Sequence, residues 1–188
     1  DPGSRLYWAL DFNVDPMSSV VAQICGGSVR VLDEIVLRRA TTDQACQEFT
    51  QRFGGHRAGV VIYGDASGNS LQTTGSTDYE VIRAHFQANS RIPVEYRIPR
   101  RNPQVRDRIC LMNAMLKTAS GEIRLLIDRK CRELIKDFEQ VAYKAETTIV
   151  DKERDRQRTH LSDALGYLIW QECRPRAEIG ERCERLLG

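Results

Sequence analysis

The stretch LYWALD at residues 6–11, followed directly by FNVDP at residues 12–16, decides how this chain is interpreted. Five apolar residues in succession are typical of a buried strand, and Asp11 closes that strand with a carboxylate. Burying an unpaired charge is energetically costly, so we expect Asp11 at the end of the strand, where it projects into a crevice. A cation bound in that crevice would stabilise the carboxylate.

The same arrangement recurs twice further along the chain. The apolar run VVIYG at residues 60–64 leads into Asp65, and Asp163 lies at the start of an apolar helix expected at residues 161–173. Folding can bring these three element ends together, and carboxylates are the ligands that Mg²⁺ and Mn²⁺ prefer. The pattern therefore predicts a site for divalent cations at Asp11, Asp65 and Asp163. Two such ions about 3.5–4 Å apart serve in-line hydrolysis of a phosphodiester.

Each acid also has a structural interpretation, and the residues alone leave both open. Asp65 can begin an Asx turn in the Gly-containing loop 65–75, and Asp163 can be an acid favoured by the helix dipole. Asp15 is either a supporting group of the metal site or part of the turn with Pro16. His160 is either a proton shuttle beside the site or an exposed loop histidine.

The composition indicates one ordinary globular domain. The chain has 188 residues, of which 41% are hydrophobic, and a net charge of +2. No apolar run approaches the length of a membrane span, and no signal peptide is recognisable. The six scattered cysteines suit a reducing cytosolic compartment. We expect a cloning remnant at residues 1–4, the domain at 5–174 and a charged tail at 175–188.

The order of apolar segments predicts an α/β fold with a mixed sheet of five strands flanked by helices. Three strands come first and form an antiparallel meander, and the later strands alternate with helices. Expected strands lie at residues 6–11, 18–25, 29–37, 60–63 and 94–98, with a further short edge strand possible at 122–127. Expected helices lie at residues 42–53, 78–88, 103–117, 129–142 and 161–173.

Two basic segments are candidates for contacts with nucleic-acid phosphates, although charged runs are also typical of solvated surface. The first lies within residues 97–108, which hold five arginines and a single acid. The second, at residues 152–158, is more balanced in charge. The candidate DNA-binding residues are Arg100, Arg101, Arg106, Lys152, Arg154 and Arg158.

Four segments together resemble the nuclease domain of a tailed-bacteriophage terminase large subunit, which has a ribonuclease-H-like fold. They are ALDFNVDPMSSVVAQ, IYGDASGNSLQTTGSTDYEVI, NPQVRDRICLMNAML and RTHLSDALGYLIW. The resemblance implies that Asp11, Asp65 and Asp163 are the metal-binding, catalytic carboxylates. Many relatives carry two adjacent acids before the final Ala-Leu, and here Ser162 takes the first of these positions, which leaves one carboxylate fewer.

The resemblance also implies a function. Such nucleases cut concatemeric double-stranded viral DNA in the host cytoplasm, with Mg²⁺ or Mn²⁺ as cofactor and little sequence preference. An ATPase motor domain normally precedes them in the same polypeptide, and the portal and the small terminase subunit are their partners. No motor motif occurs in these 188 residues. The alternatives are another ribonuclease-H-like nuclease, such as a junction resolvase or an RNA-strand nuclease, and a non-catalytic module that docks on DNA or a partner.

Overall fold

The computed structural model describes residues 1–73, 75–140 and 159–175. Its centre is one mixed sheet with the strand order β5-β4-β1-β2-β3-β6. Only β2 runs antiparallel to its neighbours, because β4 and β5 are parallel to β1 and β6 is parallel to β3. The strands are β1 (Leu6–Asp11), β2 (Met17–Cys25), β3 (Ser28–Leu37), β4 (Val60–Gly64), β5 (Val94–Tyr96) and β6 (Leu125–Ile127).

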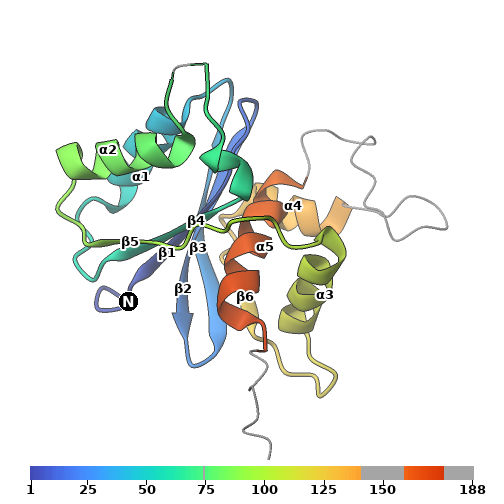
Figure 1. Ribbon diagram of the computed structural model, residues 1–188. Helices are drawn as coiled ribbons and strands as arrows, with labels where there is room; N and C mark the ends of the chain where they lie inside the picture. Colours follow the sequence, from blue (N-terminus) through green and yellow to red (C-terminus); the bar gives the residue numbers. More distant parts are fainter. Residues whose placement is uncertain (74, 141–158, 176–188) are drawn as a thin grey trace, which may run out of the picture.

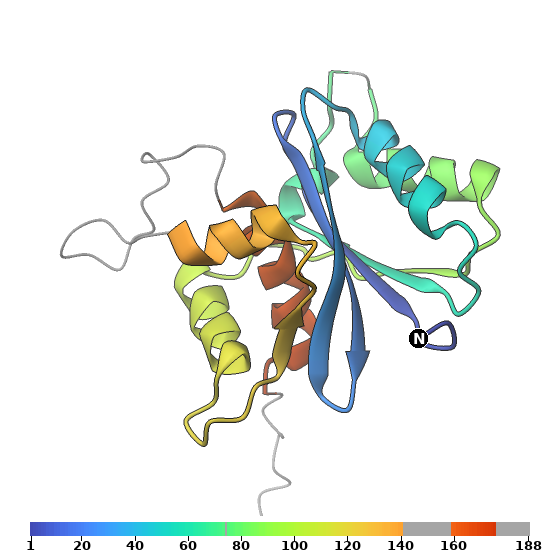
Figure 2. The same ribbon diagram turned by 180° about the vertical axis from the view of Figure 1, so that it is seen from behind.

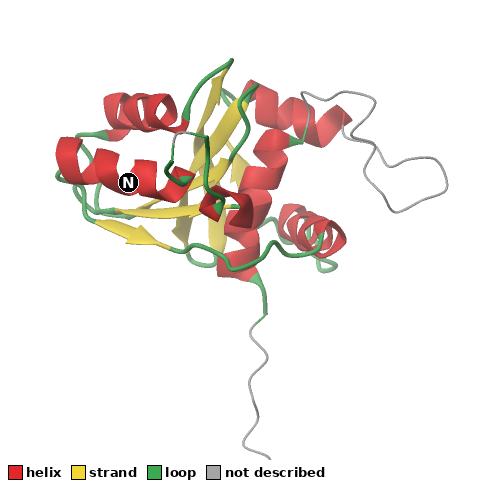
Figure 3. Ribbon diagram, turned by 45° about the horizontal axis from the view of Figure 1, so that its top comes forward, coloured by secondary structure: helices red, strands yellow, loops and turns green. Residues whose placement is uncertain are grey.

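Helices cover both faces of this sheet (Figures 1 and 2). The helices α1 and α2 pack on one face, and α3, α4 and α5 pack on the other (Figure 3). Their bounds are α1 (Thr42–Phe53), α2 (Asp78–Asn89), α3 (Val105–Leu116), α4 (Arg132–Gln140) and α5 (His160–Cys173), with a short 3₁₀ helix, η1 (Ala66–Asn69), after β4.

The strand alternation divides the core into two halves. Trp8 and Leu10 of β1 pack toward α1 and α2, whereas Ala9 between them packs toward α5. In β4, Ile62 faces α1 and α2, and Tyr63 faces α5. This parity matters for the site, because it fixes the face on which each strand-end side chain emerges.

The expected α/β fold with a mixed sheet is confirmed, but the sheet has six strands and not five. The sixth strand is the short edge segment at 125–127, which pairs with β3 along three residues. So short a strand is ambiguous in the sequence, because its place in the sheet depends on a partner almost a hundred residues earlier. Of the expected tail at 175–188, residues 176–188 lie outside the described residues.

Three further findings refine the sequence-based picture. Thr159, which the sequence suggests as the cap of the last helix, precedes α5 with a left-handed φ of 83°, and its side chain makes no capping hydrogen bond. The five cysteines in the described ranges are free thiols. Within those same ranges, no helix is both long enough and apolar enough to cross a membrane.

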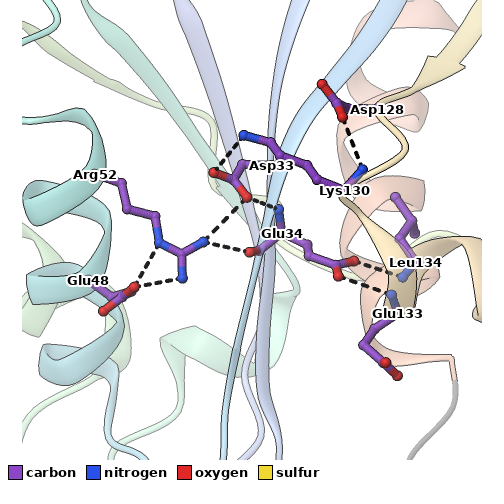
Figure 4. A network of polar contacts seen from close by, with 8 residues as sticks. All are labelled: Asp33, Glu34, Glu48, Arg52, Asp128, Lys130, Glu133 and Leu134. Carbon is purple, nitrogen blue, oxygen red and sulfur yellow. Dashed lines mark hydrogen bonds and ion pairs between the residues drawn. The ribbon is translucent and has the colours of Figure 1, made fainter.

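A polar network joins the two sides of the sheet through two adjacent acids of β3 (Figure 4). Asp33 forms ion pairs with Arg52 of α1 and with Lys130, which precedes α4. Glu34 accepts hydrogen bonds from the backbone amides of Glu133 and Leu134, at 3.0 and 2.8 Å. Glu34 therefore caps the N-terminus of α4 from outside the helix, satisfying amides that have no partner within it.

Replacing Glu34 by glutamine tests this cap. A neutral amide can accept at only one of the two positions and turns its NH₂ group toward the other backbone N–H. We therefore expect Glu34→Gln to lower the free energy of unfolding by about 1–2 kcal/mol in urea denaturation. Glu122→Gln removes the same charge from an exposed pair with Arg124 and should leave the stability nearly unchanged. Equal stabilities for the two variants would contradict the assignment.

Candidate functional site

Two aspartates lie side by side where β1 and β4 end. The strands are adjacent and parallel, and their register pairs Leu10 with Gly64, so Asp11 and Asp65 follow at the same edge of the sheet. Strand alternation places Asp11 on the same face as Ala9, and Asp65 on the same face as Tyr63. Both side chains therefore emerge on the face that α5 covers. Carboxyl ends of adjacent parallel strands are a common place for ligand sites.

Asp11 is nearly buried, with 5% of its surface exposed. Its Oδ2 accepts a hydrogen bond from the side-chain amide of Asn13 at 2.5 Å and lies 2.9 Å from His160 Nδ1. Burial raises the pKa of the Asp11 carboxyl, the hydrogen bond with His160 lowers it, and the negative charges of Asp163 and Asp65 raise it. The carboxylate is thus held in a place where negative charge is costly.

Asp65 caps the short helix η1. Its Oδ1 accepts from the backbone amides of Ser67 and Gly68, at 2.7 and 3.2 Å, and from the Ser67 hydroxyl. The Asx-type interpretation of this residue therefore holds for one oxygen. Within the described residues Oδ2 has no hydrogen bond, which leaves it available to a cation. The structural and the functional interpretation are compatible.

Asp163 lies in the first turn of α5, and its side chain is 14% exposed. Its Oδ1 is 3.0 Å from Nη2 of Arg108 in α3, and its backbone carbonyl accepts from Arg108 Nη1 at 3.1 Å. Arg108 is itself buried, with 4% exposed, and its guanidinium stacks on the Tyr167 ring at 4.3 Å. A buried cation therefore holds the third acid.

The three acids act on one common neighbour. Burial raises the pKa of the Tyr167 phenol, Arg108 lowers it, and the negative charges of Asp11, Asp163 and Asp65 each raise it. The charges of all three carboxylates thus act on a single side chain of α5. The geometry agrees with this: Asp11 contacts His160 at the start of α5, Asp163 lies in the first turn of that helix, and Asp65 follows β4, whose Tyr63 packs in the same core cluster as α5.

The donor chemistry suits a hard divalent cation, because all three acids offer carboxylate oxygens. In the conformation seen, however, the described residues include no group of three His, Cys, Asp or Glu side chains arranged to hold a metal ion. Each acid instead has protein partners: His160 and Asn13 hold Asp11, backbone amides hold Asp65, and Arg108 holds Asp163. Binding a cation would require side chains to exchange some of these partners for it.

Three further residues were candidates for supporting the site, namely Asp15, His160 and Ser162, and their contacts differ. His160 contacts Asp11 directly. Ser162 is buried, donates its hydroxyl to the Thr159 carbonyl and donates its backbone amide to Asp137 Oδ2 at 3.2 Å. Asp15 instead forms exposed ion pairs with Arg38 and Arg39. Its described contacts therefore belong to the surface of the β1–β2 turn.

The arginines of residues 97–108 divide into two groups. Arg97 forms ion pairs with Glu95 and Glu172, and Arg108 pairs with Asp163. Arg100, Arg101 and Arg106 are exposed. Arg100 and Arg101 lie in the loop before α3, and Arg106 lies in the first turn of α3. This loop touches the loop of Asp65, because Asn102 Oδ1 accepts from the Ala66 amide at 2.7 Å. The three exposed arginines therefore lie on a segment bound to one wall of the site, whereas Lys152, Arg154 and Arg158 lie outside the described residues.

Three polar residues of this region are not apparent from the sequence. Asn13 resembles a turn residue, Asp137 is one of several polar positions on an amphipathic helix, and Arg108 is one of a run of surface arginines. Asn13 could have been singled out by its position two residues after Asp11, because its side chain easily reaches back to that strand end. The other two meet α5 only through tertiary packing.

Comparisons with known proteins agree with this fold. A family model described as the terminase RNaseH-like domain matches residues 8–172. No curated protein sequence matches the chain.

Three solved structures show the same fold at low sequence identity. The large terminase of a thermophilic bacteriophage is 14% identical with a TM-score of 0.58, over 92% of this chain and 41% of that one. The large terminase nuclease domain of P22 is 14% identical with a TM-score of 0.59, over 89% and 80%. The nuclease domain of the g2p large terminase of bacteriophage SPP1, with bound Mn, is 14% identical with a TM-score of 0.52, over 90% and 87%. The chain thus spans less than half of the thermophilic phage's large terminase, and the expected ribonuclease-H-like fold is confirmed.

The loop that carries Asp65 depends on a close packing contact at Gly68. A Cβ atom at this position would lie 2.4 Å from the Phe12 ring and 2.8 Å from the Tyr79 ring, which itself stacks edge-on against Phe12. We therefore expect Gly68→Ala to lower the free energy of unfolding by about 1–3 kcal/mol in chemical denaturation.

Gly55→Ala is the matched control, because its Cβ would meet no atom within 4 Å. That variant should stay within about 0.5 kcal/mol of the parent protein. A Gly68→Ala protein as stable as the control would show that the rings move aside without cost.

Proposed function

The chain belongs to the family of terminase RNaseH-like domains, and we propose that it is a divalent-metal-dependent endonuclease that cleaves double-stranded viral DNA during genome packaging. The observation that carries the proposal is the pair of adjacent parallel strands β1 and β4, because Asp11 ends β1 and Asp65 directly follows β4 on the face of the sheet that α5 covers, with Asp163 in the first turn of that helix. Three carboxylates around one helix end are a donor set for Mg²⁺ or Mn²⁺. The manganese bound to the similar SPP1 nuclease domain supports this cofactor.

In the proposed site Asp11, Asp65 and Asp163 would hold the cations. Two ions would be bound when DNA is in place. Bound there, the ions would lower the pKa of a water molecule and stabilise the leaving oxygen of a phosphodiester. His160 and Asn13 fix the orientation of the Asp11 carboxylate through their contacts with Oδ2. The cap on η1 fixes Asp65 in the same way and leaves Oδ2 to face the cation.

The exposed arginines next to the Asp65 loop are the proposed DNA contacts. Arg100, Arg101 and Arg106 are exposed cations on the segment that Asn102 ties to Ala66. Arginine contacts to phosphates position DNA without reading its sequence, which suits an enzyme with little sequence preference. Lys152, Arg154 and Arg158 remain candidates for the same role.

The partners of the whole protein follow from the family as part of the same proposal. A longer polypeptide would carry an ATPase motor domain, consistent with the 41% of the thermophilic phage's large terminase that this chain covers. The portal and the small terminase subunit would be its partners in the host cytoplasm. A junction resolvase, an RNA-strand nuclease and a non-catalytic DNA-docking module are the competing functions, and the substrates tested below separate them.

Asp65→Asn tests the catalytic role most sharply, because asparagine is as good a cap as aspartate. Its side-chain oxygen can still accept from the Ser67 and Gly68 amides, so the fold should persist while the charge is lost. We expect Mn²⁺-dependent nicking of a plasmid to fall at least about a hundredfold (~2.7 kcal/mol). Asp107→Asn, an exposed acid of α3, is the control and should cut normally.

Undiminished cleavage by Asp65→Asn would remove Asp65 from the mechanism. Faster cutting of four-way junctions or RNA–DNA hybrids than of duplex DNA would favour the other nucleases. Salt-sensitive DNA binding by the parent protein, with no cleavage in any divalent metal, would favour the docking module.

The double variant Arg100→Gln/Arg101→Gln tests the DNA contacts. Each phosphate contact contributes about 0.9 to the slope of log affinity against log salt for duplex DNA, so the slope should become shallower by about 1.8. Fluorescence anisotropy with labelled duplexes of several sequences should show the same loss for all of them. An unchanged slope would place the DNA elsewhere on the surface.

A further inference from the structure

Arg108 stands apart from the other arginines of its segment because its charge is buried inside the candidate site. Only 4% of the residue is exposed, and its guanidinium lies between the Tyr167 ring and Asp163. Nη2 pairs with Asp163 Oδ1, and Nη1 donates to the Asp163 carbonyl. The buried Nε has no hydrogen-bond partner within the described residues. An unsatisfied buried donor on a charged group is unfavourable, so stability alone does not explain this position.

The fold leaves Arg108 little freedom to withdraw. Gly166, one turn after Asp163 on α5, gives the arginine its space, since a Cβ there would lie 3.3 Å from Nη1. Met112 of α3 lies beside the same spot. The positive charge therefore lies next to Asp163 in a closely packed place, and an incoming metal ion would meet it there.

We propose that Arg108 is a positioning residue that competes with the divalent cation for Asp163, and so sets a low metal affinity for the DNA-free site. The inference rests on the proposed function of the three acids. Arg108 orients the Asp163 carboxylate by its two contacts and neutralises one of the three negative charges. The site without DNA is then too weakly charged to retain cations tightly, and a DNA phosphate restores the missing negative charge.

The expected size of the effect follows from how one charge acts on another at this distance. A cation within about 4–6 Å changes the proton affinity of a carboxylate by about ten- to a thousandfold. A divalent cation carries twice the charge of a proton, and Asp163 is buried enough for screening by solvent to be weak. Removing the Arg108 charge should therefore tighten metal binding by at least about tenfold.

The experiment measures Mn²⁺ affinity by calorimetry without DNA, and the Tm with Mn²⁺ and with chelator. Arg108→Gln and Arg108→Met remove the charge, and methionine also fills apolar space against Tyr167. We expect both variants to bind Mn²⁺ at least about tenfold more tightly than the parent. Both should be less stable in chelator, because Asp163 loses its ion pair with Arg108, and both should gain more in Tm from Mn²⁺ than the parent does.

Two controls separate charge from shape. Arg108→Lys keeps a cation beside Asp163 and should keep an affinity near that of the parent. Arg91→Gln removes an exposed arginine between α2 and β5 and should change neither the Mn²⁺ affinity nor the Tm. Parent-like Mn²⁺ affinity in folded Arg108→Gln and Arg108→Met would overturn the proposal, and so would an equal loss of Tm with and without Mn²⁺. A parent protein that neither binds Mn²⁺ nor cuts DNA would instead overturn the proposed function.

Discussion

The parallel pairing of β1 with β4 is the constraint on which the rest of the site depends. Its register brings two strand ends to the same edge, and the alternation of side chains sends Asp11 and Asp65 to the same face. A slip of one residue in either strand would turn that strand's carboxylate toward α1 and α2. The apolar residues of both strands oppose such a slip, because Trp8 and Ile62 are fully buried against those helices. Core packing therefore fixes the geometry of the acids.

Gathering three carboxylates at a buried edge creates an electrostatic cost, and each acid offsets it by a different interaction. Asp11 has the imidazole of His160 and the amide of Asn13, Asp65 has the free amides of η1, and Asp163 has a guanidinium. Asp65 is held by neutral amides, so a cation could bind its carboxylate in addition to them. Asp163 is held by the full positive charge of Arg108, which repels a second cation. The three acids are thus unequal as candidate ligands, and the difference lies in their partners and not in the acids themselves.

The sequence was sufficient for the fold class and for most element boundaries, because the apolar segments have a clear period. It was also sufficient to place Asp11, Asp65 and Asp163 at the ends of those segments, where the structure has them. The sequence was not sufficient to predict that Arg108 is buried in the site. Among five arginines in twelve residues, a buried one looks the same as an exposed one, and only the packing of α3 on α5 distinguishes it. Glu34 is a similar case, since a strand acid that caps a helix a hundred residues away leaves no local pattern. The strand at 125–127 was indistinct for the same reason.

Those non-local contacts form a path that ends at the site. Glu34 of β3 caps the N-terminus of α4, and α4 in turn presents the buried Asp137 to the backbone amide of Ser162. A carboxylate from a neighbouring helix thus meets the first turn of α5 at Ser162. Anions are favoured at a helix N-terminus, and Asp137 therefore holds the start of α5 by the same physics that favours Asp163 within it. The position of the third acid thus depends on the sheet twice, once through the packing of α5 and once through the cap on α4.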